Sequence, residues 1–170
     1  MHKRVGLKLL ADVLIVPHHT GRVSTPKRDK ATNRELYEKI LTPKVGIISV
    51  STANTYKHPK PHAIASLRAA GAAVVCTQIT QQCCRHLEKL RLGLITPYSP
   101  SQSSPGKSAM GTGKFKDAAC FGTVVIGINP DELVIDRLGE HQQKVEGLAA
   151  AGYTPLCRPS QTSRRIGGIG

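Results

Sequence analysis

The hydrophobic positions of this chain fall into short, nearly continuous runs separated by polar segments. Three of these runs occupy residues 9–16, 45–50 and 72–77, and only Asp12 interrupts the first. A strand that is buried on both faces of a sheet has no alternation of polar and apolar residues. The runs therefore predict three interior strands, the first of which ends at Pro17.

Between these runs, apolar residues recur at the spacing of a helix. Thr32 or Asn33 can cap a first helix, which Pro43 ends. A second helix is predicted over residues 59–70, where Gly71 provides the stop. The residues expected to face inward are Leu36, Tyr37, Ile40 and Leu41 in the first helix and Ile64 and Leu67 in the second.

The pattern resumes after a polar interval. A short helix is predicted over residues 81–92, and a β-hairpin over 123–136 has Pro130 in its turn. A last helix over 140–151 ends at Gly152. Strands that alternate with helices predict the α/β class.

Two segments show no periodicity. Residues 97–119 are rich in Ser, Gly, Pro and Lys, which favours a long disordered insert over an ordered lid or binding loop. Residues 159–170 are expected to form a disordered tail. One domain over residues 1–158 therefore accounts for the structured part of the chain.

Charge narrows the choice of partners. The 24 Lys and Arg against 11 Asp and Glu give a net charge of +13, which favours a phosphate-containing substrate or nucleic acid. The alternative is a basic, solvated surface without a specific partner. With no Trp and only six Phe and Tyr in total, a module that stacks bases on aromatic rings is not expected.

The first residues are basic and then apolar, as in a secretory signal. Lys8 and Asp12 interrupt the apolar part, however, and no small-x-small cleavage site follows. No run approaches the roughly 20 apolar residues of a membrane span. An odd number of cysteines, five, without a secretory signal indicates a reducing compartment. The predicted localisation is cytoplasmic.

Histidines stand where two of the predicted strands end. His18 and His19 follow the first strand, and His58 follows the second and precedes a helix. The positive end of the helix dipole keeps an imidazole neutral, so His58 could bind zinc or accept a proton, or simply cap the helix. Adjacent residues of an extended segment point to opposite sides, so we expect one of His18 and His19 to face a cleft while the other packs.

Other polar residues accompany His58. Asn54 and Tyr56 could hydrogen-bond an oxygen of a substrate, although stabilisation of the turn is the more favoured role for Asn54. His62, one helical turn after His58, is interpreted as a surface residue.

Together these segments resemble a known family. The matching residues are Asp12-Val13-Leu14, Val16-Pro17-His18-His19, Pro43, Ile47-Ile48-Ser49-Val50, Asn54, Tyr56, His58-Pro59 and Pro61. They resemble the C-terminal half of a metallo-β-lactamase-fold hydrolase, of the kind fused to the competence DNA-uptake channel protein. The resemblance covers residues 11–77 and, more faintly, 122–138. It implies the C-terminal half of an αββα sandwich with a closing β-hairpin.

The resemblance also implies a chemistry. The resemblance implies zinc-dependent hydrolysis of a phosphodiester or nucleic acid, with His58 as a metal ligand or proton shuttle and His18 and His19 lining the site. The family's H-x-H-x-D-H motif is absent, so the complete zinc site is not expected in this chain. We therefore expect a partial domain that is inactive as given, with a homodimer or an N-terminal half on another chain as its partner. The alternative function is a non-catalytic, basic module that binds phosphate or nucleic acid.

The cysteines offer a second possible site. Cys83, Cys84, Cys120 and Cys157, with His86 or His141, could bind a structural zinc ion. No C-x-x-C spacing supports such a site. Their interpretation as small buried hydrophobic residues is favoured instead.

Overall fold

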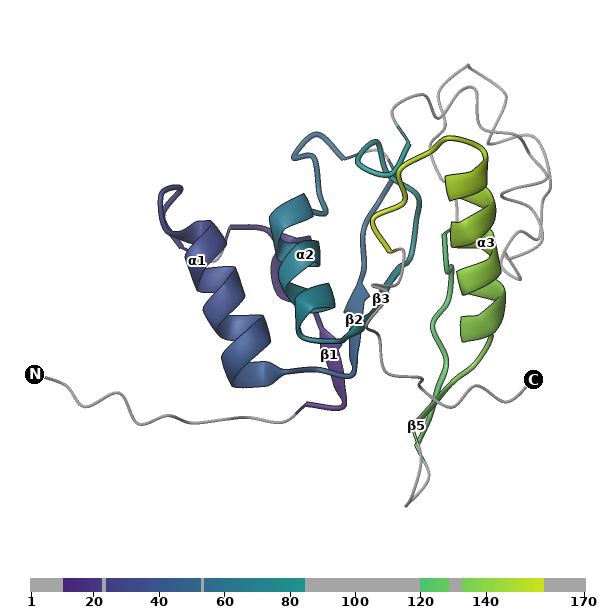
Figure 1. The fold of residues 1–170 in the computed structure, drawn as a ribbon, viewed down its shortest axis with the longest axis horizontal. Coiled ribbons are helices and arrows are strands. Elements are labelled where there is room, and N and C mark those ends of the chain that lie inside the picture. The colour runs from purple at the N-terminus through teal and green to yellow at the C-terminus, as the bar shows by residue number, and fades with distance from the viewer. Residues whose placement is uncertain (1–10, 23, 53, 85–119, 129–132, 158–170) are drawn as a thin grey trace, which may run out of the picture.

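A computed structural model describes residues 11–22, 24–52, 54–84, 120–128 and 133–157. Within this part the fold is of the mixed α/β type, with a small parallel sheet, a hairpin and three α-helices (Figure 1). None of the helices in these ranges is long and apolar enough to cross a membrane. The predicted insert 97–119, the tail 159–170, most of the predicted helix 81–92 and the turn at Pro130 lie outside the described residues.

The sheet has three parallel strands in the order β1–β2–β3. They are β1 (Val13–Ile15), β2 (Val45–Ile48) and β3 (Ala73–Cys76). The predicted runs are confirmed as strands. Because the strands are parallel, the chain leaves all three at the same edge of the sheet.

The central strand explains the two layers of the core. Every residue of β2 is buried, and its side chains alternate between the two faces. Ile48 packs in the main core with the helices, whereas Val45 and Ile47 pack in a second cluster on the other face. At Gly46, an added Cβ would lie 3.4 Å from both methyl groups of Leu67. The small residue thus lets α2 (Pro61–Ala69) lie close to the sheet.

The first strand differs from its prediction. In β1, Val13 and Leu14 are only half-buried, and Ile15 is 72% exposed. The prediction that this strand is buried on both faces is therefore wrong, because β1 lies at the edge of the sheet rather than inside it. An apolar run of residues can have the same composition at the edge of a sheet as in its interior, so composition alone does not distinguish the two.

The first helix begins earlier than its sequence suggested. α1 (Asp29–Arg34) continues directly into a π-helix, η2 (Glu35–Leu41). Asn33 lies inside α1, where its side-chain amide donates to the backbone carbonyl of Asp29 at 2.8 Å. The expectation that Thr32 or Asn33 caps the helix is therefore wrong. Tyr37 is fully buried, as its place in the apolar stripe predicted.

The remaining elements follow their predicted order. β4 (Ile126–Ile128) and β5 (Leu133–Ile135) form an antiparallel hairpin, which confirms that prediction. α3 (Leu138–Ala150) follows it. Both α2 and α3 are followed by a glycine with φ of +86°, Gly71 and Gly152, as a left-handed helix stop requires.

The hairpin and α3 lie on the opposite side of the molecule from α1 (Figure 1). Ile135 and Leu138 pack against the face of the sheet formed by Val45 and Ile47. Farther along α3, Val145 and Leu148 join the main core. The sheet is thus covered on both faces, but its β1 edge is left uncovered by the described residues.

Candidate functional site

The turn after β1 holds the histidine pair in an uncommon backbone conformation. His18, His19 and Thr20 have φ values of 50°, 52° and 68°. Residues other than glycine rarely adopt this left-handed backbone conformation, and where they do, the surrounding structure must hold them in it. The segment is therefore a tight turn, η1 (Pro17–Thr20), and not the extended chain that the sequence suggested.

Contacts with the next loops hold this turn. The buried Thr20 hydroxyl accepts a hydrogen bond from the backbone N–H of Lys60 at 2.5 Å. Nδ1 of His19 is hydrogen-bonded to the backbone carbonyl of Ser49. An added Cβ at Gly21 would collide with the ring of His18, so only glycine allows this turn. The turn after β1 is therefore joined to the segment that follows β2.

A second loop places His58 beside the pair. The Asn54 side-chain oxygen accepts from the backbone N–H of His58 at 2.7 Å, and its amide nitrogen donates to the carbonyls of Ser51 and His58 at 2.8 and 3.1 Å. All of these bonds are internal to the loop. Turn stabilisation, one of the two roles expected for Asn54, is the role that the structure displays.

The two turns bring three histidines together. The ring centre of His58 lies 5.8 Å from that of His18 and 6.3 Å from that of His19. The expectation that the adjacent histidines point to opposite sides is therefore wrong, because consecutive left-handed residues do not alternate as a strand does. Tyr56 adds a fourth ring, 6.1 Å from His58 and 76% exposed. We call His18, His19 and His58 the histidine cluster.

His58 has the chemical state that a metal ligand or base needs. Burial lowers its pKa, and Lys60, His18 and His19 lower it further by charge repulsion. The imidazole is therefore neutral at neutral pH. Its Nδ1 atom is buried and has no hydrogen-bond partner among the residues that the structure describes. An unpartnered buried acceptor or donor costs free energy, and a bound ion or ligand would remove that cost.

His62 was expected to be a surface residue. Instead, its side chain pairs with a residue of the first helix. Its Nε2 lies 2.9 Å from a carboxylate oxygen of Asp29, which is buried. This contact joins α2 to α1 and places His62 outside the histidine cluster. His62 therefore has a structural role.

The donor set of the histidine cluster fits zinc in kind but not in number. Neutral imidazoles are common zinc ligands, and catalytic zinc is usually held by three protein groups. Among the residues that the structure describes, however, only one group of three metal-ligating side chains converges on a common point, and it lies elsewhere. The histidine cluster therefore offers part of a metal centre.

That converging group consists of Cys120, His141 and Cys157. All three are buried, and their ligand atoms lie within 4.8 Å of one another. Sγ of Cys120 lies 3.4 Å from Nε2 of His141. Cys76 adjoins the group, with its Sγ 3.3 Å from that of Cys157. Sequence spacing gave no signal for this group, since its members are far apart along the chain.

The surroundings of the group shift the pKa values of its neighbours. A hydrogen bond with Cys157 and burial raise the pKa of the Cys120 thiol, and burial raises that of Cys83 to about 11. Burial lowers the pKa of Lys144 to about 8. The ammonium group of Lys144 donates to the carbonyl of Cys120 at 3.1 Å. Without a metal ion the thiols are therefore protonated at neutral pH.

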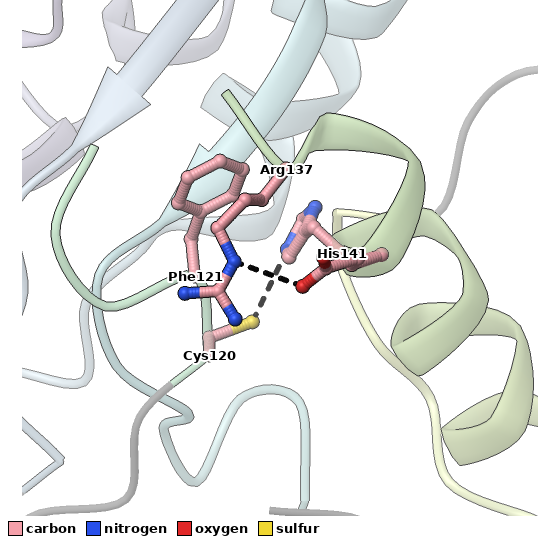
Figure 2. Close-up of a pocket in the computed structure, with 5 residues that line it drawn as sticks. Cys120, Phe121, Arg137 and His141 are labelled. Atoms are coloured by element: carbon pink, nitrogen blue, oxygen red, sulfur yellow. Dashed lines mark hydrogen bonds and ion pairs between the residues drawn. The ribbon is translucent and has the colours of Figure 1, made fainter. Parts of the chain in front are cut away.

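A small pocket opens onto this group. Figure 2 shows the sulfur of Cys120 and the ring of His141 facing one another beside Phe121 and Arg137. Arg137 forms an ion pair with Glu140 at 2.9 Å on the pocket wall. The pocket encloses about 180 Å³ of empty space, including the part open to solvent. Two of the three ligating side chains, Cys120 and His141, therefore line the pocket, although each is only 4% exposed.

Comparison with known proteins adds no identification: no family model, curated protein or solved structure matches this chain.

Proposed function

We propose that the histidine cluster belongs to a zinc-dependent hydrolytic centre that acts on phosphodiesters, with nucleic acid as the substrate class. The observation that carries this proposal is the gathering of the rings of His18 and His19 beside that of His58, whose buried Nδ1 has no hydrogen-bond partner among the described residues. The resemblance of these loops to the metallo-β-lactamase-fold hydrolases points to the same chemistry.

Each residue has a distinct part in this proposal. His58 is neutral and buried, so it serves as a metal ligand or moves a proton at its ring nitrogen. His18 supplies a second imidazole from the neighbouring turn. His19 is held by the Ser49 carbonyl, which leaves one ring nitrogen for the site. A bound zinc ion would supply an activated water and polarise the scissile phosphoryl group.

Charge around the cluster suits an anionic substrate. Lys57 and Lys60 belong to the loop that carries His58, and Lys60 is close enough to lower the pKa of that histidine. Tyr56 presents an exposed ring and hydroxyl at the same place. With the net charge of +13, these groups favour the approach of a phosphate backbone.

The ligand count predicts how the chain behaves alone. Because the described residues hold too few converging ligands at the histidine cluster, we propose that further ligands come from another segment or another chain. The chain alone should then hydrolyse neither bis-p-nitrophenyl phosphate nor DNA above background. Zinc-dependent turnover by the isolated chain that disappears in His58→Ala would overturn this part of the proposal.

The test of metal binding uses the imidazole resonances of the full chain. Adding zinc should shift or broaden the ring signals of His58 and His18, while the ring of His62, paired with Asp29, stays unchanged as an internal control. His58→Ala should abolish the effect at His18. Unchanged His18 and His58 signals at millimolar zinc would overturn the assignment of a metal centre here.

The net charge also favours a second candidate, a non-catalytic module that binds phosphate or nucleic acid without a metal. The two functions differ in their dependence on zinc. Binding of single-stranded DNA that is unaffected by a chelator and by His58→Ala supports the module. Binding that weakens in both cases supports the hydrolytic centre.

A further inference from the structure

A second group of ligating side chains lies beside the end of β3 and α3, and its cysteines belong to the main core. Cys120 directly precedes the hairpin segment, His141 lies in the first half of α3, and Cys157 follows that helix. Their exposed fractions are between 4% and 5%. Within the described part of the chain, no hydrogen bond or ring contact joins them to the histidine cluster, so the two groups can be tested separately.

The spacing of these atoms suits a tetrahedral metal ion. Bond lengths of about 2.3 Å for zinc–sulfur and about 2.0 Å for zinc–nitrogen place neighbouring ligand atoms about 3.5 to 3.8 Å apart. The Cys120 sulfur and the His141 nitrogen are separated by 3.4 Å. The sulfurs of Cys157 and Cys76 are separated by 3.3 Å. Shifts of a few tenths of an ångström would bring these pairs to the ligand spacing.

We propose that Cys120, His141 and Cys157 bind a structural zinc ion, with Cys76 as the fourth ligand. Three thiols and one imidazole form a donor set that structural zinc sites commonly use. Structural sites have no open position for substrate, and the burial of all four residues agrees with that role. The pocket lined by Cys120 and His141 provides the path by which the ion enters (Figure 2).

Simple filling of the core explains these residues less well. Cysteines are often buried as small hydrophobic residues, but that role does not require their sulfurs to meet at one point. Here the ligand atoms of Cys120, His141 and Cys157, which come from separate parts of the chain, lie within 4.8 Å of one another, and the sulfur of Cys76 lies 3.3 Å from that of Cys157. If the imidazole of His141 only filled space in the core, an apolar ring could take its place at little cost in free energy.

The proposed ion would join elements that are remote in sequence. Cys76 ends β3, His141 belongs to α3, and 81 positions separate Cys76 from Cys157. Binding releases the thiol protons and crosslinks β3, the start of the hairpin segment, α3 and the segment that follows α3. The ion therefore stabilises the half of the fold that lies on the hairpin side.

Cobalt is the probe for this site, because Co²⁺ occupies tetrahedral zinc sites and its thiolate bonds absorb in the near ultraviolet. The full chain, kept reduced and with its free thiols counted, should show this band and lose it when zinc is added. Cys120→Ser and Cys157→Ser should each abolish the band, and Cys76→Ser should reduce it by about a third, in proportion to the thiolates lost. Cys84→Ser, which changes a buried cysteine outside the group, is the matched control and should keep it.

Three results would overturn the proposal. One is a wild-type chain, with all thiols reduced, that shows no thiolate–cobalt band. The second is a band that survives Cys120→Ser or Cys157→Ser. The third is an undiminished band in Cys76→Ser, which would show that Cys76 is not the fourth ligand. Because a serine variant can fail to fold, zinc should also raise the melting temperature of the wild-type chain by about 5 °C when in large excess.

The same experiment separates this site from the proposed function. A variant that carries both His18→Ala and His58→Ala should keep the full cobalt band and the response of the His141 ring to zinc, whereas the ring of His19 should no longer respond. Loss of the band in that variant would show that cobalt binding depends on the histidine cluster. It would overturn the assignment of Cys120, His141 and Cys157 as the metal site.

Discussion

The side-chain amide of Asn54 bonds both backbone groups of His58, accepting from its N–H at 2.7 Å and donating to its carbonyl at 3.1 Å. Four positions separate the two residues, so the bonds close a compact loop. The orientation of the buried imidazole in the histidine cluster therefore depends on a neighbour that need not touch any substrate.

Replacement of Asn54 tests this dependence. Asn54→Ala removes three hydrogen bonds within the loop and should lower the free energy of unfolding by about 1–3 kcal/mol. The zinc response of the His58 ring should weaken as well, because the ring is no longer held beside His18. Urea unfolding and NMR measure the two effects. Thr55→Ala, at an exposed neighbouring position, is the control, and equal losses in both variants would contradict the role of Asn54.

The pKa of His58 is a second measurable quantity. In metal-free protein its ring should titrate below the ordinary value of about 6.5, since burial and three nearby cations or imidazoles disfavour the charged form. Lys60→Met removes the largest of the charge contributions and should raise the pKa. Imidazole chemical shifts followed from pH 4 to 8 give both values. An unshifted pKa in the wild-type chain would show that His58 is not desolvated.

Tyr37 predicts a dependence of stability on alkaline pH. Burial, and secondarily the charge of Asp29, raise the pKa of Tyr37 above its ordinary value of 10.0. A raised pKa in the folded state means that folding keeps the proton, so this contribution is full below pH 10 and is lost as the pH rises through the folded pKa. Relative to the wild-type chain, Tyr37→Phe should therefore become progressively more stable above about pH 10.

At neutral pH the same substitution should be almost neutral. Within the described ranges the buried Tyr37 hydroxyl has no hydrogen-bond partner, so its removal should change the free energy of unfolding by less than about 1 kcal/mol, in the stabilising direction. Urea unfolding at pH 7 and at several values above pH 10 compares the variants. A loss of more than about 2 kcal/mol at pH 7 would reveal a hydrogen bond that the structure does not contain.

The uncovered edge of the sheet predicts self-association. Within the described ranges β1 pairs only with β2, and Ile15 of this strand is 72% exposed. Exposed strand edges with apolar side chains pair with other chains. The wild-type chain should form dimers or larger species in sedimentation velocity, and Ile15→Lys should shift it toward the monomer. Ile128→Lys, at an exposed hairpin position, should have no such effect. A monomeric wild-type chain would contradict this prediction.

The buried elements of the fold were predictable because their side chains fix both the face and the period. Residues 45–48 and 72–76 contain no polar side chain, and both segments form strands of the sheet. Gly71 and Gly152 marked where helices end, since few other residues adopt a positive φ at low cost. The edge position of β1 was not predictable, because composition does not reveal whether a neighbouring strand is present.

Both candidate sites were less accessible to sequence reasoning. The left-handed turn at His18 and His19 has no signature in residue type, and it is the turn that makes the pair converge on His58. The group of Cys120, His141 and Cys157 lacks a short repeat because its members meet only after β3 and α3 have packed. The hydrogen-bonding role of Asn54 could be predicted because it acts locally along the chain.

The contacts of Cys120 also bear on how the length of this chain can vary. Its backbone N–H donates to the carbonyl of Thr77 at 3.0 Å, and that of Phe121 donates to the carbonyl of Cys76 at 2.9 Å. The described residues that precede and follow positions 85–119 therefore meet at one corner of the sheet. The free energy of closing a loop grows only with the logarithm of its length. A chain in which residues 85–119 are replaced by a short glycine–serine linker should therefore keep the sheet and fold.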